Sequence, residues 1–363
     1  MLKVHLIAAA RPNFMKVAPV WHALRQSDWC RPVLIHTGQH YDANMSDAFF
    51  VDLGLPAPDH HLGIGSGTHS EQTAGVMVAY EKILVAAPPD WTIVVGDVNS
   101  TVACTLAAAK LGLRVAHLEA GLRSYDRTMP EEINRIVTDA IADVLWTPSE
   151  DADENLRHEG VAPDRVTRVG NIMIDSYELL RPKIEAATTR ARFGLAARSY
   201  GVVTLHRPSN VDAPEALGEL VTALGAVARR LPLVFALHPR TRKNLAAFGL
   251  LDTLEGQPGM HVTEPLSYIP FMGLVREAKL VITDSGGIQE ETTYLGIPCL
   301  TLRNTTERPI TVSQGTNRLV RAETLGEIVE SILAGGGPVA RCPPLWDGRT
   351  AERVAADLRR RSS

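Results

Sequence analysis

Trp91-Thr92-Ile93-Val94-Val95-Gly96-Asp97 is the stretch that decides the fold class. Its apolar run lacks the alternation of a half-exposed strand, so we expect a strand that is covered on both faces. A segment of helical length follows at residues 101–110, as it does after each strand of a parallel sheet. The glycine and aspartate at the end of the strand begin a polar turn, which is where open α/β sheets bind ligands.

Short β-branched runs alternate with helix-length segments on both sides of this stretch. The pattern predicts two doubly wound, Rossmann-like domains at residues 1–169 and 170–345, with a hinge near Gly170. An amphipathic C-terminal helix within 346–363 is expected to pack back on the first domain, and an earlier helix is predicted at 19–26. The predicted strands lie at 4–8, 33–37, 91–96, 115–119 and 144–147, and then at 202–205, 234–237, 260–262, 280–283 and 299–302.

The composition excludes several classes of protein. The chain has 363 residues with 45% hydrophobic and 21% charged residues, enough for two cores, and its net charge of −4 argues against a nucleic-acid or membrane-surface partner. No apolar run is long enough for a membrane span and no signal peptide is visible, so we expect a soluble cytoplasmic protein. The four cysteines are widely spaced, which argues against a disulfide framework and against a zinc site.

Polar residues fall just past the predicted strand ends. Because the carboxyl ends of parallel strands meet at one edge of a sheet, we expect the two sheets to face each other across one shared cleft. The residues at these positions are Arg11, Gln39, His40, Asp97, Glu119, His206, His238 and Ser285.

Asp284-Ser285-Gly286-Gly287-Ile288-Gln289-Glu290-Glu291 predicts a diphosphate site. A strand ends here, two glycines permit close approach, and the N–H groups of a starting helix suit an anion. Glu291, one turn later, is placed to accept hydrogen bonds from ribose hydroxyls. An ordinary strand-to-helix turn is the alternative. The chain lacks a P-loop and a G-x-G-x-x-G motif, which counts against an NTPase and a typical dehydrogenase.

Basic residues elsewhere suit the same anion. Arg11 and Lys16 follow the first strand and can turn towards a phosphate, although a solvated basic turn is the alternative. His206 and His238 each end a strand in the second half and can donate to a phosphate, the alternative being satisfied structural histidines.

Three carboxylates are candidates for proton transfer: Asp97, Glu119 and Glu131. Asp97 is also suited to cap the next helix. Glu131 is also suited to a capping box with Thr128 or to a surface ion pair with Arg135. Glu119, at the end of a buried strand and before a glycine, is the hardest to explain structurally.

Together these motifs resemble the UDP-N-acetylglucosamine 2-epimerase family, of the non-hydrolysing type, from residue 10 to about residue 320. The segments that carry the resemblance are Ala10-Arg11-Pro12, Thr37-Gly38-Gln39-His40, Gly96-Asp97, His117-Leu118-Glu119-Ala120-Gly121-Leu122-Arg123, Pro130-Glu131-Glu132, Asn134-Arg135, His206-Arg207, Asp284 to Glu291 and Thr306-Glu307-Arg308-Pro309.

The resemblance implies the GT-B fold and a homodimer. It implies no nicotinamide cofactor, because epimerisation involves no net redox change. No H-E-x-x-H or other metal-ligand spacing is present in the sequence, so we expect no metal. The resemblance implies anti elimination of UDP to a 2-acetamidoglucal and re-addition of UDP after C2 is reprotonated on the opposite face. Asp97, Glu119, Glu131 and His206 are the implied catalytic residues. The implied substrate-binding residues are Arg11, Lys16, Gln39, His40, Arg135, His238, Ser285, Gly286, Gly287, Glu291 and Arg308.

Two segments depart from the family pattern. Residues 41–46, Tyr-Asp-Ala-Asn-Met-Ser, differ from the allosterically activated branch and look like relatives acting on diacetamido-uronic acid UDP-sugars. Ala9 stands where glycine is common. The alternatives are therefore a 2-epimerase of such a modified UDP-sugar, a hydrolysing 2-epimerase, a GT-B glycosyltransferase, or a sugar-nucleotide-binding protein without catalysis.

Overall fold

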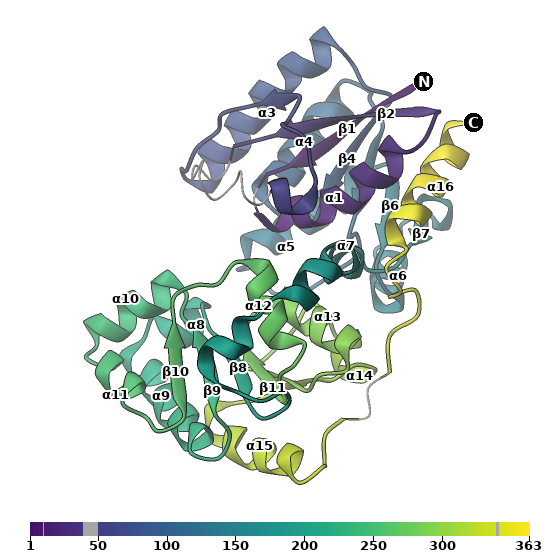
Figure 1. Ribbon diagram of the computed structural model, residues 1–363. Coiled ribbons are helices and arrows are strands. Elements are labelled where there is room, and N and C mark those ends of the chain that lie inside the picture. Colours follow the sequence, from purple (N-terminus) through teal and green to yellow (C-terminus); the bar gives the residue numbers. More distant parts are fainter. Residues whose placement is uncertain (10, 39–49, 339–340) are drawn as a thin grey trace. The chain divides into compact units, whose positions relative to one another are not determined.

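The computed structural model describes residues 1–9, 11–38, 50–338 and 341–363, and within them the chain forms two α/β units (Figure 1). Unit 1 comprises Met1–Leu180 together with Pro344–Ser363, and unit 2 comprises Arg181–Pro343. The predicted boundary at Gly170 falls before the start of α7 (Ile172–Ala186), the helix along which the chain passes from unit 1 to unit 2.

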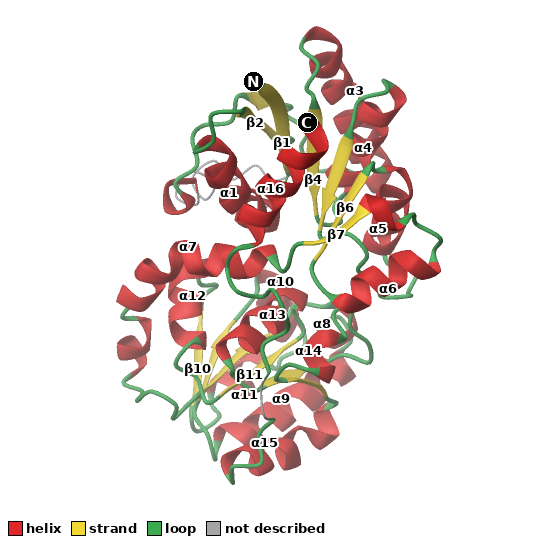
Figure 2. Cartoon of the chain, turned by 90° about the vertical axis from the view of Figure 1, so that its right-hand side faces the viewer, coloured by secondary structure: helices red, strands yellow, loops and turns green. Residues whose placement is uncertain are grey.

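Unit 1 is built on a parallel sheet with the strand order β3-β2-β1-β4-β5-β6-β7. All five residues of β4 are buried, which confirms that this strand is covered on both faces. In Figure 2, α1 and α16 lie on one face of the sheet, and α3, α4 and α5 lie on the other. The strands are β1 (Leu2–Ala8), β2 (Cys30–His36), β3 (His60–His61), β4 (Trp91–Val95), β5 (Val115–Leu118), β6 (Val144–Thr147) and β7 (Val166–Arg168); the helices are α1 (Arg11–Arg25), α3 (His69–Ala86), α4 (Asn99–Lys110), α5 (Pro130–Ile141), α6 (Glu150–His158), η1 (Pro163–Arg165), α7 and α16 (Thr350–Ser362).

Unit 2 repeats the topology of unit 1, with the strand order β10-β9-β8-β11-β12-β13, all parallel. An apolar core from Val203 to Ile332 fills the space between its sheet and helices. The strands are β8 (Gly201–Thr204), β9 (Leu233–Ala236), β10 (Met260–Thr263), β11 (Leu280–Thr283), β12 (Cys299–Thr301) and β13 (Asn317–Leu319); the helices are η2 (Thr189–Phe193), α8 (Pro208–Val211), α9 (Pro214–Ala228), α10 (Pro239–Ala247), α11 (Leu251–Glu255), α12 (Tyr268–Val275), α13 (Gly286–Leu295), α14 (Ile310–Ser313), η3 (Ala322–Thr324) and α15 (Leu325–Leu333).

The structure confirms two doubly wound α/β units and all ten predicted strands; the strands at 144–147 and 280–283 match at both ends, and the ends of the others differ by at most three residues. The prediction of a helix starting at Pro19 is wrong, because α1 begins at Arg11 and carries Pro19 inside it. A proline lacks the N–H that would bond to the carbonyl four residues earlier. That carbonyl belongs to Met15, and it accepts the hydroxyl of Ser176 at 2.5 Å instead.

The C-terminal helix α16 belongs to unit 1, where it packs against α1 and ends near the N-terminus (Figure 1). Its first N–H groups, those of Thr350 and Ala351, donate to the carboxylate of Asp175 on α7 at 3.1 and 2.8 Å. At the other end of α16, Asp357 accepts a hydrogen bond from the indole N–H of Trp146 in β6, and Ser362 accepts one from the indole N–H of Trp91 in β4. No helix in the described ranges is both long enough and apolar enough to span a bilayer.

Candidate active site

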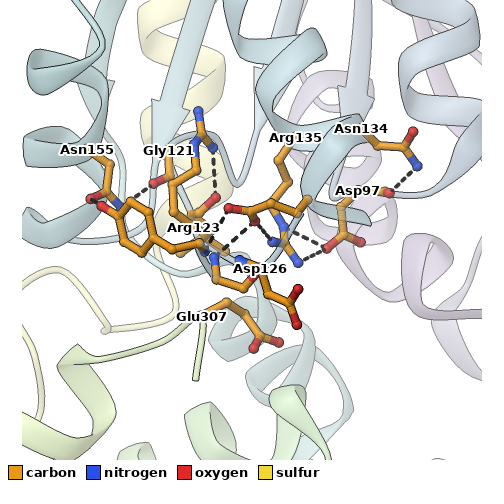
Figure 3. Close-up of polar contacts among 12 residues, drawn as sticks. Asp97, Gly121, Arg123, Asp126, Asn134, Arg135, Asn155 and Glu307 are labelled. Atoms are coloured by element: carbon orange, nitrogen blue, oxygen red, sulfur yellow. Dashed lines mark hydrogen bonds and ion pairs between the residues drawn. The ribbon is translucent and has the colours of Figure 1, made fainter. Parts of the chain in front are cut away.

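Asp97 lies in the turn between β4 and α4, and its carboxylate faces Arg135 on α5 (Figure 3). Arg135 lies 3.0 Å from Asp97 Oδ2 with both Nε and Nη2. Asn134, on the same helix, donates to the backbone carbonyl of Asp97 at 2.9 Å. The N-cap of α4 is Val98 without a side-chain cap bond, so capping does not explain Asp97. The side chain of Asp97 is 32% exposed, which leaves a fixed carboxylate within reach of a ligand.

Glu119 follows β5 directly and has a φ of 72°, a left-handed conformation that is uncommon outside glycine. Such a backbone costs about 1–3 kcal/mol and persists where the surroundings impose it, often at functional sites. Its buried carboxylate forms an ion pair with Lys16 of α1 through Oε2, while Oε1 has no hydrogen-bond partner among the described residues. A Cβ on Gly96 would stand 3.0 Å from Lys16 Nζ, so the glycine makes room for this pair. An unpaired buried carboxylate oxygen calls for a partner, which a substrate can supply.

Behind Glu119 lies a buried pair formed by His117 of β5 and Asp139 of α5. His117 Nδ1 is 2.6 Å from Asp139, and its Nε2 is 2.8 Å from the carbonyl oxygen of Gly96. Asp139 also accepts the N–H of Gly121 at 3.0 Å and pairs with Arg123 at 2.8 Å. Burial opposes ionisation of Asp139, but His117, Arg123 and the N–H of Gly121 outweigh it, and the pKa of Asp139 lies below its ordinary value.

Glu131 lies in the first turn of α5 and is half-buried. The predicted capping box does not form, since Thr128 donates its hydroxyl to Asp126 at 2.6 Å and no side chain caps α5. Nor does Glu131 pair with Arg135, which instead binds Asp97 and the buried carboxylate of Glu132. Within the described residues, neither structural explanation of Glu131 holds.

In unit 2, Asp284 follows β11 and is fully buried. It accepts the backbone N–H groups of His206 and Arg207 and the amide of Asn210 at 2.9–3.1 Å. His206 Nδ1 stands 2.8 Å from Asp284 Oδ1, while the His206 side chain is 40% exposed, so the remaining nitrogen Nε2 is directed away from the aspartate. Burial works against ionisation of Asp284, but His206, Arg207 and Asn210 prevail and lower its pKa.

His238 caps α10 and has its ring centre 5.6 Å from that of His206. Its Nδ1 accepts the N–H of Arg240 at 3.3 Å, which places the proton of the neutral ring on Nε2. Partial burial and the neighbouring His206 lower the pKa of His238, in spite of the attraction of Asp284. The two histidines therefore present two imidazole nitrogens beside the end of the sheet.

The turn from β11 into α13 contains Ser285, Gly286 and Gly287. Ser285 is the N-cap of the ten-residue helix, yet its side chain makes no cap bond, so the first N–H groups lack a side-chain acceptor there. A Cβ on Gly287 would meet no atom of the described chain within 4 Å. A Cβ on Gly286 would stand 2.7 Å from Glu307 Oε1 and 3.0 Å from Arg308 Nη1. Gly286 therefore serves packing, and Gly287 faces open space next to a helix N-terminus, where anions bind favourably.

Arg308 lies between two buried carboxylates. Its Nε is 2.9 Å from Glu290, and its Nη1 is 2.9 Å from Glu307. Arg303 pairs with the other oxygen of Glu307 at 2.8 Å. Burial would raise the pKa of Glu307, but Arg308 and Arg303 hold it well below its ordinary value. The charge of Arg308, a predicted ligand of the substrate, is thus shared with the protein's own carboxylates.

Glu291 on α13 is buried, and one of its oxygens accepts the hydroxyl of Tyr268 at 2.6 Å. Burial raises its pKa to about 7, helped by the neighbouring Glu290 and opposed by Tyr268. A carboxyl group of this kind can accept hydrogen bonds and, when protonated, donate one.

Several predicted site residues fall outside what the structure describes. Gln39, His40 and residues 41–46 lie outside the described residues, as does the side chain of Arg11, whose backbone begins α1. Across the described ranges, no group of three His, Cys, Asp or Glu side chains could hold a metal ion. Cys30, Cys104 and Cys299 are buried free thiols.

The sequence model of the UDP-N-acetylglucosamine 2-epimerase family matches residues 22–359. The chain belongs to this family.

Relatives in the UDP-N-acetylglucosamine 2-epimerase family resemble the chain over almost its whole length. It is 41% identical to the UDP-N-acetylglucosamine 2-epimerase of Methanocaldococcus jannaschii, over 98% of this chain and 99% of that protein. A crystal structure of the M. jannaschii enzyme in complex with UDP-GlcNAc and UDP has a TM-score of 0.88 at 40% identity, covering 99% of this chain and all of the other. The UDP-2,3-diacetamido-2,3-dideoxy-D-glucuronate 2-epimerase of Pseudomonas aeruginosa is 39% identical over 88% of this chain and 89% of that protein.

In this member of the epimerase family, each unit gathers its own set of predicted residues. Unit 1 brings together Lys16 with Glu119 and Asp97 with Arg135. Unit 2 brings together His206 with His238, and Arg308 with the helix turn at Gly286. Sequence reasoning missed Asp139, Glu132 and Asp284 as polar centres that hold these residues. The spacing Glu132, Arg135, Asp139 on one face of α5 was the available signal for the first two.

Proposed function

We propose that the protein interconverts UDP-N-acetylglucosamine and UDP-N-acetylmannosamine. The identity of 41% to the M. jannaschii enzyme over nearly the whole chain carries this proposal. A base removes the proton on C2, the C1–O bond breaks, and UDP departs with the bonding electrons, leaving a C1=C2 double bond. An acid then delivers a proton to the opposite face of C2, and UDP adds back to C1. Atoms and electrons balance, so the reaction requires no oxidant or reductant.

The residues of unit 2 suit the nucleotide. His206 Nε2 can donate to the diphosphate while Asp284 holds Nδ1, an orientation that stabilises the charge of departing UDP. Ser285, Gly287 and the start of α13 offer hydroxyl and N–H donors, with Gly286 packed beneath them. We assign His238 to the same phosphates and Glu291 to the ribose hydroxyls. Arg308 contributes positive potential next to the glycine turn while it stays paired with Glu290 and Glu307.

The carboxylates of unit 1 suit the proton transfers. Two-sided chemistry at C2 needs one group to take a proton and another to give one. Glu119 offers its unpaired Oε1, Asp97 is oriented by Arg135, and Glu131 is not engaged by a cap or an ion pair in the described chain. We assign these three to the chemistry, with Lys16 holding Glu119 and, together with Arg11, Gln39 and His40, lining the substrate.

Incubation with UDP-N-acetylglucosamine in D2O, followed by NMR, tests the proposal. We expect deuterium at C2 and a new UDP-N-acetylmannosamine signal. Glu119→Gln should abolish exchange and still bind UDP, because the nucleotide residues lie in unit 2. Glu154→Gln is the matched control. Glu154 is exposed on α6, so this variant should exchange deuterium at C2 at the wild-type rate.

Other outcomes identify the alternatives. Free N-acetylmannosamine with an equal amount of UDP would identify a hydrolysing enzyme. Exchange only with a 2,3-diacetamido-uronic acid UDP-sugar would replace the substrate and keep the reaction. Sugar transfer to an acceptor, or UDP binding without any turnover, would overturn the epimerase proposal.

The homodimer and the cytoplasmic location are proposed on family resemblance and composition. Light scattering coupled to size exclusion should give twice the chain mass of 39.4 kDa. A monomer at micromolar concentration would contradict the dimer.

A further inference from the structure

Glu119 stands between two residues that are tied to the same aspartate. His117, two positions before it, pairs with Asp139 Oδ1 at 2.6 Å. Gly121, two positions after it, donates its N–H to Asp139 Oδ2 at 3.0 Å. Asp139 on α5 therefore contacts the chain both before and after the strained residue Glu119. We call His117, Asp139 and the N–H of Gly121 the clamp.

The hydrogen-bonding capacity of the clamp is fully used. The carbonyl of Gly96 can only accept, so His117 Nε2, 2.8 Å away, is the donor. Gly96 is also the residue whose missing side chain leaves room for the ion pair of Glu119 and Lys16. The imidazole of His117 therefore links the backbone of Gly96 to Asp139. Asp139 in turn binds the N–H of Gly121, in the loop after Glu119.

A second layer fixes Asp139 itself. Arg123 contacts Asp139 Oδ2 at 2.8 Å and bonds to Glu159 with two parallel hydrogen bonds of 2.7 Å. Asn155 donates to the carbonyl of Gly121 at 2.8 Å. His117, Arg123 and Asp139 are all buried, so their hydrogen bonds are shielded from water.

A buried ion network of this kind also stabilises a fold, which is the simpler explanation. It does not account for where the contacts end. They end at the His117 side chain before Glu119, at the N–H of Gly121 after it, and at the carbonyl of Gly96 beside its ion pair. Glu119 is the strained carboxylic residue between these contacts.

We propose that His117 and Asp139 are positioning residues for Glu119. They hold its backbone in the left-handed conformation, so that Oε2 meets Lys16 and Oε1 stays unpaired. The catalytic consequence rests on the proposed function, whereas the structural consequence for Glu119 does not.

His117→Phe keeps a ring of similar size and removes both nitrogens. In its crystal structure we expect Glu119 to leave the left-handed region and to separate from Lys16. In the exchange assay we expect kcat to fall about 100-fold, as misplacement of a reacting group by about 1 Å can cause, with KM and the Kd for UDP changed less than about twofold.

Two further variants separate positioning from stability. Asp139→Asn can still accept from Gly121 and donate to a neutral His117 that keeps its bond to Gly96, so kcat should stay within about tenfold of wild type. Tyr80→Phe removes a buried hydroxyl bonded to His5 and Thr92 in the same unit, away from Glu119, and should lower the melting temperature without changing kcat.

The inference is overturned if Glu119 keeps its conformation and its ion pair in His117→Phe, or if Tyr80→Phe loses kcat as severely as His117→Phe at equal stability. Wild-type protein that fails to exchange deuterium would overturn the proposed function alone. A displaced Glu119 in the variant crystal would still support the positioning role.

Discussion

Each unit of this protein contains a histidine whose Nδ1 faces a buried aspartate, at 2.6 Å for His117 and Asp139 in unit 1 and at 2.8 Å for His206 and Asp284 in unit 2. The aspartates are equally buried, and the pKa of each is lowered by its neighbours in spite of burial. The histidines differ. His117 is fully buried and its Nε2 bonds to a backbone carbonyl, whereas His206 is 40% exposed and Nε2 has no partner in the described chain.

The difference shows that a histidine–aspartate pair has no role by itself. The aspartate orients the ring, and the destination of the other nitrogen decides what the ring does. In unit 1 that nitrogen links β5 to the turn that follows β4. In unit 2 it remains available to a ligand. The predictions below test this difference, beginning with the largest expected effect.

His117→Ala should lower the free energy of unfolding of unit 1 by about 3–5 kcal/mol, the usual loss when one partner of a buried ion pair is removed. His206→Ala should lower that of unit 2 by less than about 1 kcal/mol, because the ring is partly exposed. In urea unfolding, tryptophan fluorescence reports on unit 1, which contains all five tryptophans, and circular dichroism reports on both units. Equal losses of unfolding free energy in the two variants would show that the exposure of the histidine ring does not decide how much each histidine–aspartate pair stabilises its unit.

His206→Ala should reduce kcat/KM for UDP-N-acetylglucosamine about 100- to 1,000-fold, which is typical for the loss of one donor to developing negative charge. The circular dichroism spectrum should not change. His158→Ala, a change of an exposed histidine on α6, is the control and should retain full activity. A normal rate in His206→Ala would mean that Nε2 does not act on UDP.

Acid should destabilise both units through their aspartates. A carboxyl group with a lowered folded pKa stabilises fully above its unfolded pKa, about 3.9, and this stability is lost as the pH falls through the lower folded value. Unfolding free energies should therefore fall below pH 4 with a slope of up to about 1.4 kcal/mol per pH unit for each group. Asp139→Asn should flatten the slope for unit 1 only. An unchanged slope would show that the Asp139 carboxylate does not keep its charge in the folded protein.

Glu291 should respond in the opposite sense. Its folded pKa of about 7 is raised, so the unfolded chain releases this proton first and stability falls as the pH rises from about 4.3 to 7. Glu291→Gln should gain stability relative to wild type between pH 5 and pH 8, by about 2–3 kcal/mol. Thermal unfolding across this range measures the difference, and Glu264→Gln on the exposed surface of unit 2 serves as the control. A stability difference between Glu291→Gln and wild type that stays the same from pH 5 to pH 8 would show that Glu291 does not titrate in this range.

The fold was largely predictable because strands buried on both faces contain continuous apolar runs, as in Trp91–Val95 and Leu280–Thr283. The strands that were missed lie near the edges of the sheets and lack such runs. β3 consists of His60 and His61, both exposed, and β7 reads Val-Thr-Arg with no buried residue. Helix α1 was predicted too short because a proline favours a helix start, and a serine hydroxyl from α7 that replaces a backbone bond cannot be seen in the local sequence.

The candidate site was predictable where a polar residue ends a strand, as for Asp97 and Glu119. It was not predictable where a helix supplies the support. Asp139 shares one face of α5 with Glu132 and Arg135, but only the fold brings it next to His117. Glu131 and Glu132 are neighbours of the same chemistry, and the phase of α5 decides that Glu132 turns inward to the N–H groups of Ser124 and Tyr125.

The return of α16 to unit 1 has a consequence for how the protein is made. A ribosome adds about 5–20 residues per second, so roughly ten seconds or more separate Leu180 from the first residue of the returning segment. During that interval the nascent first unit lacks the helix that covers α1, and the indoles of Trp91 and Trp146 lack Ser362 and Asp357. Unit 2 is contiguous and can fold on emerging from the exit tunnel, so the unit that is begun first is completed last.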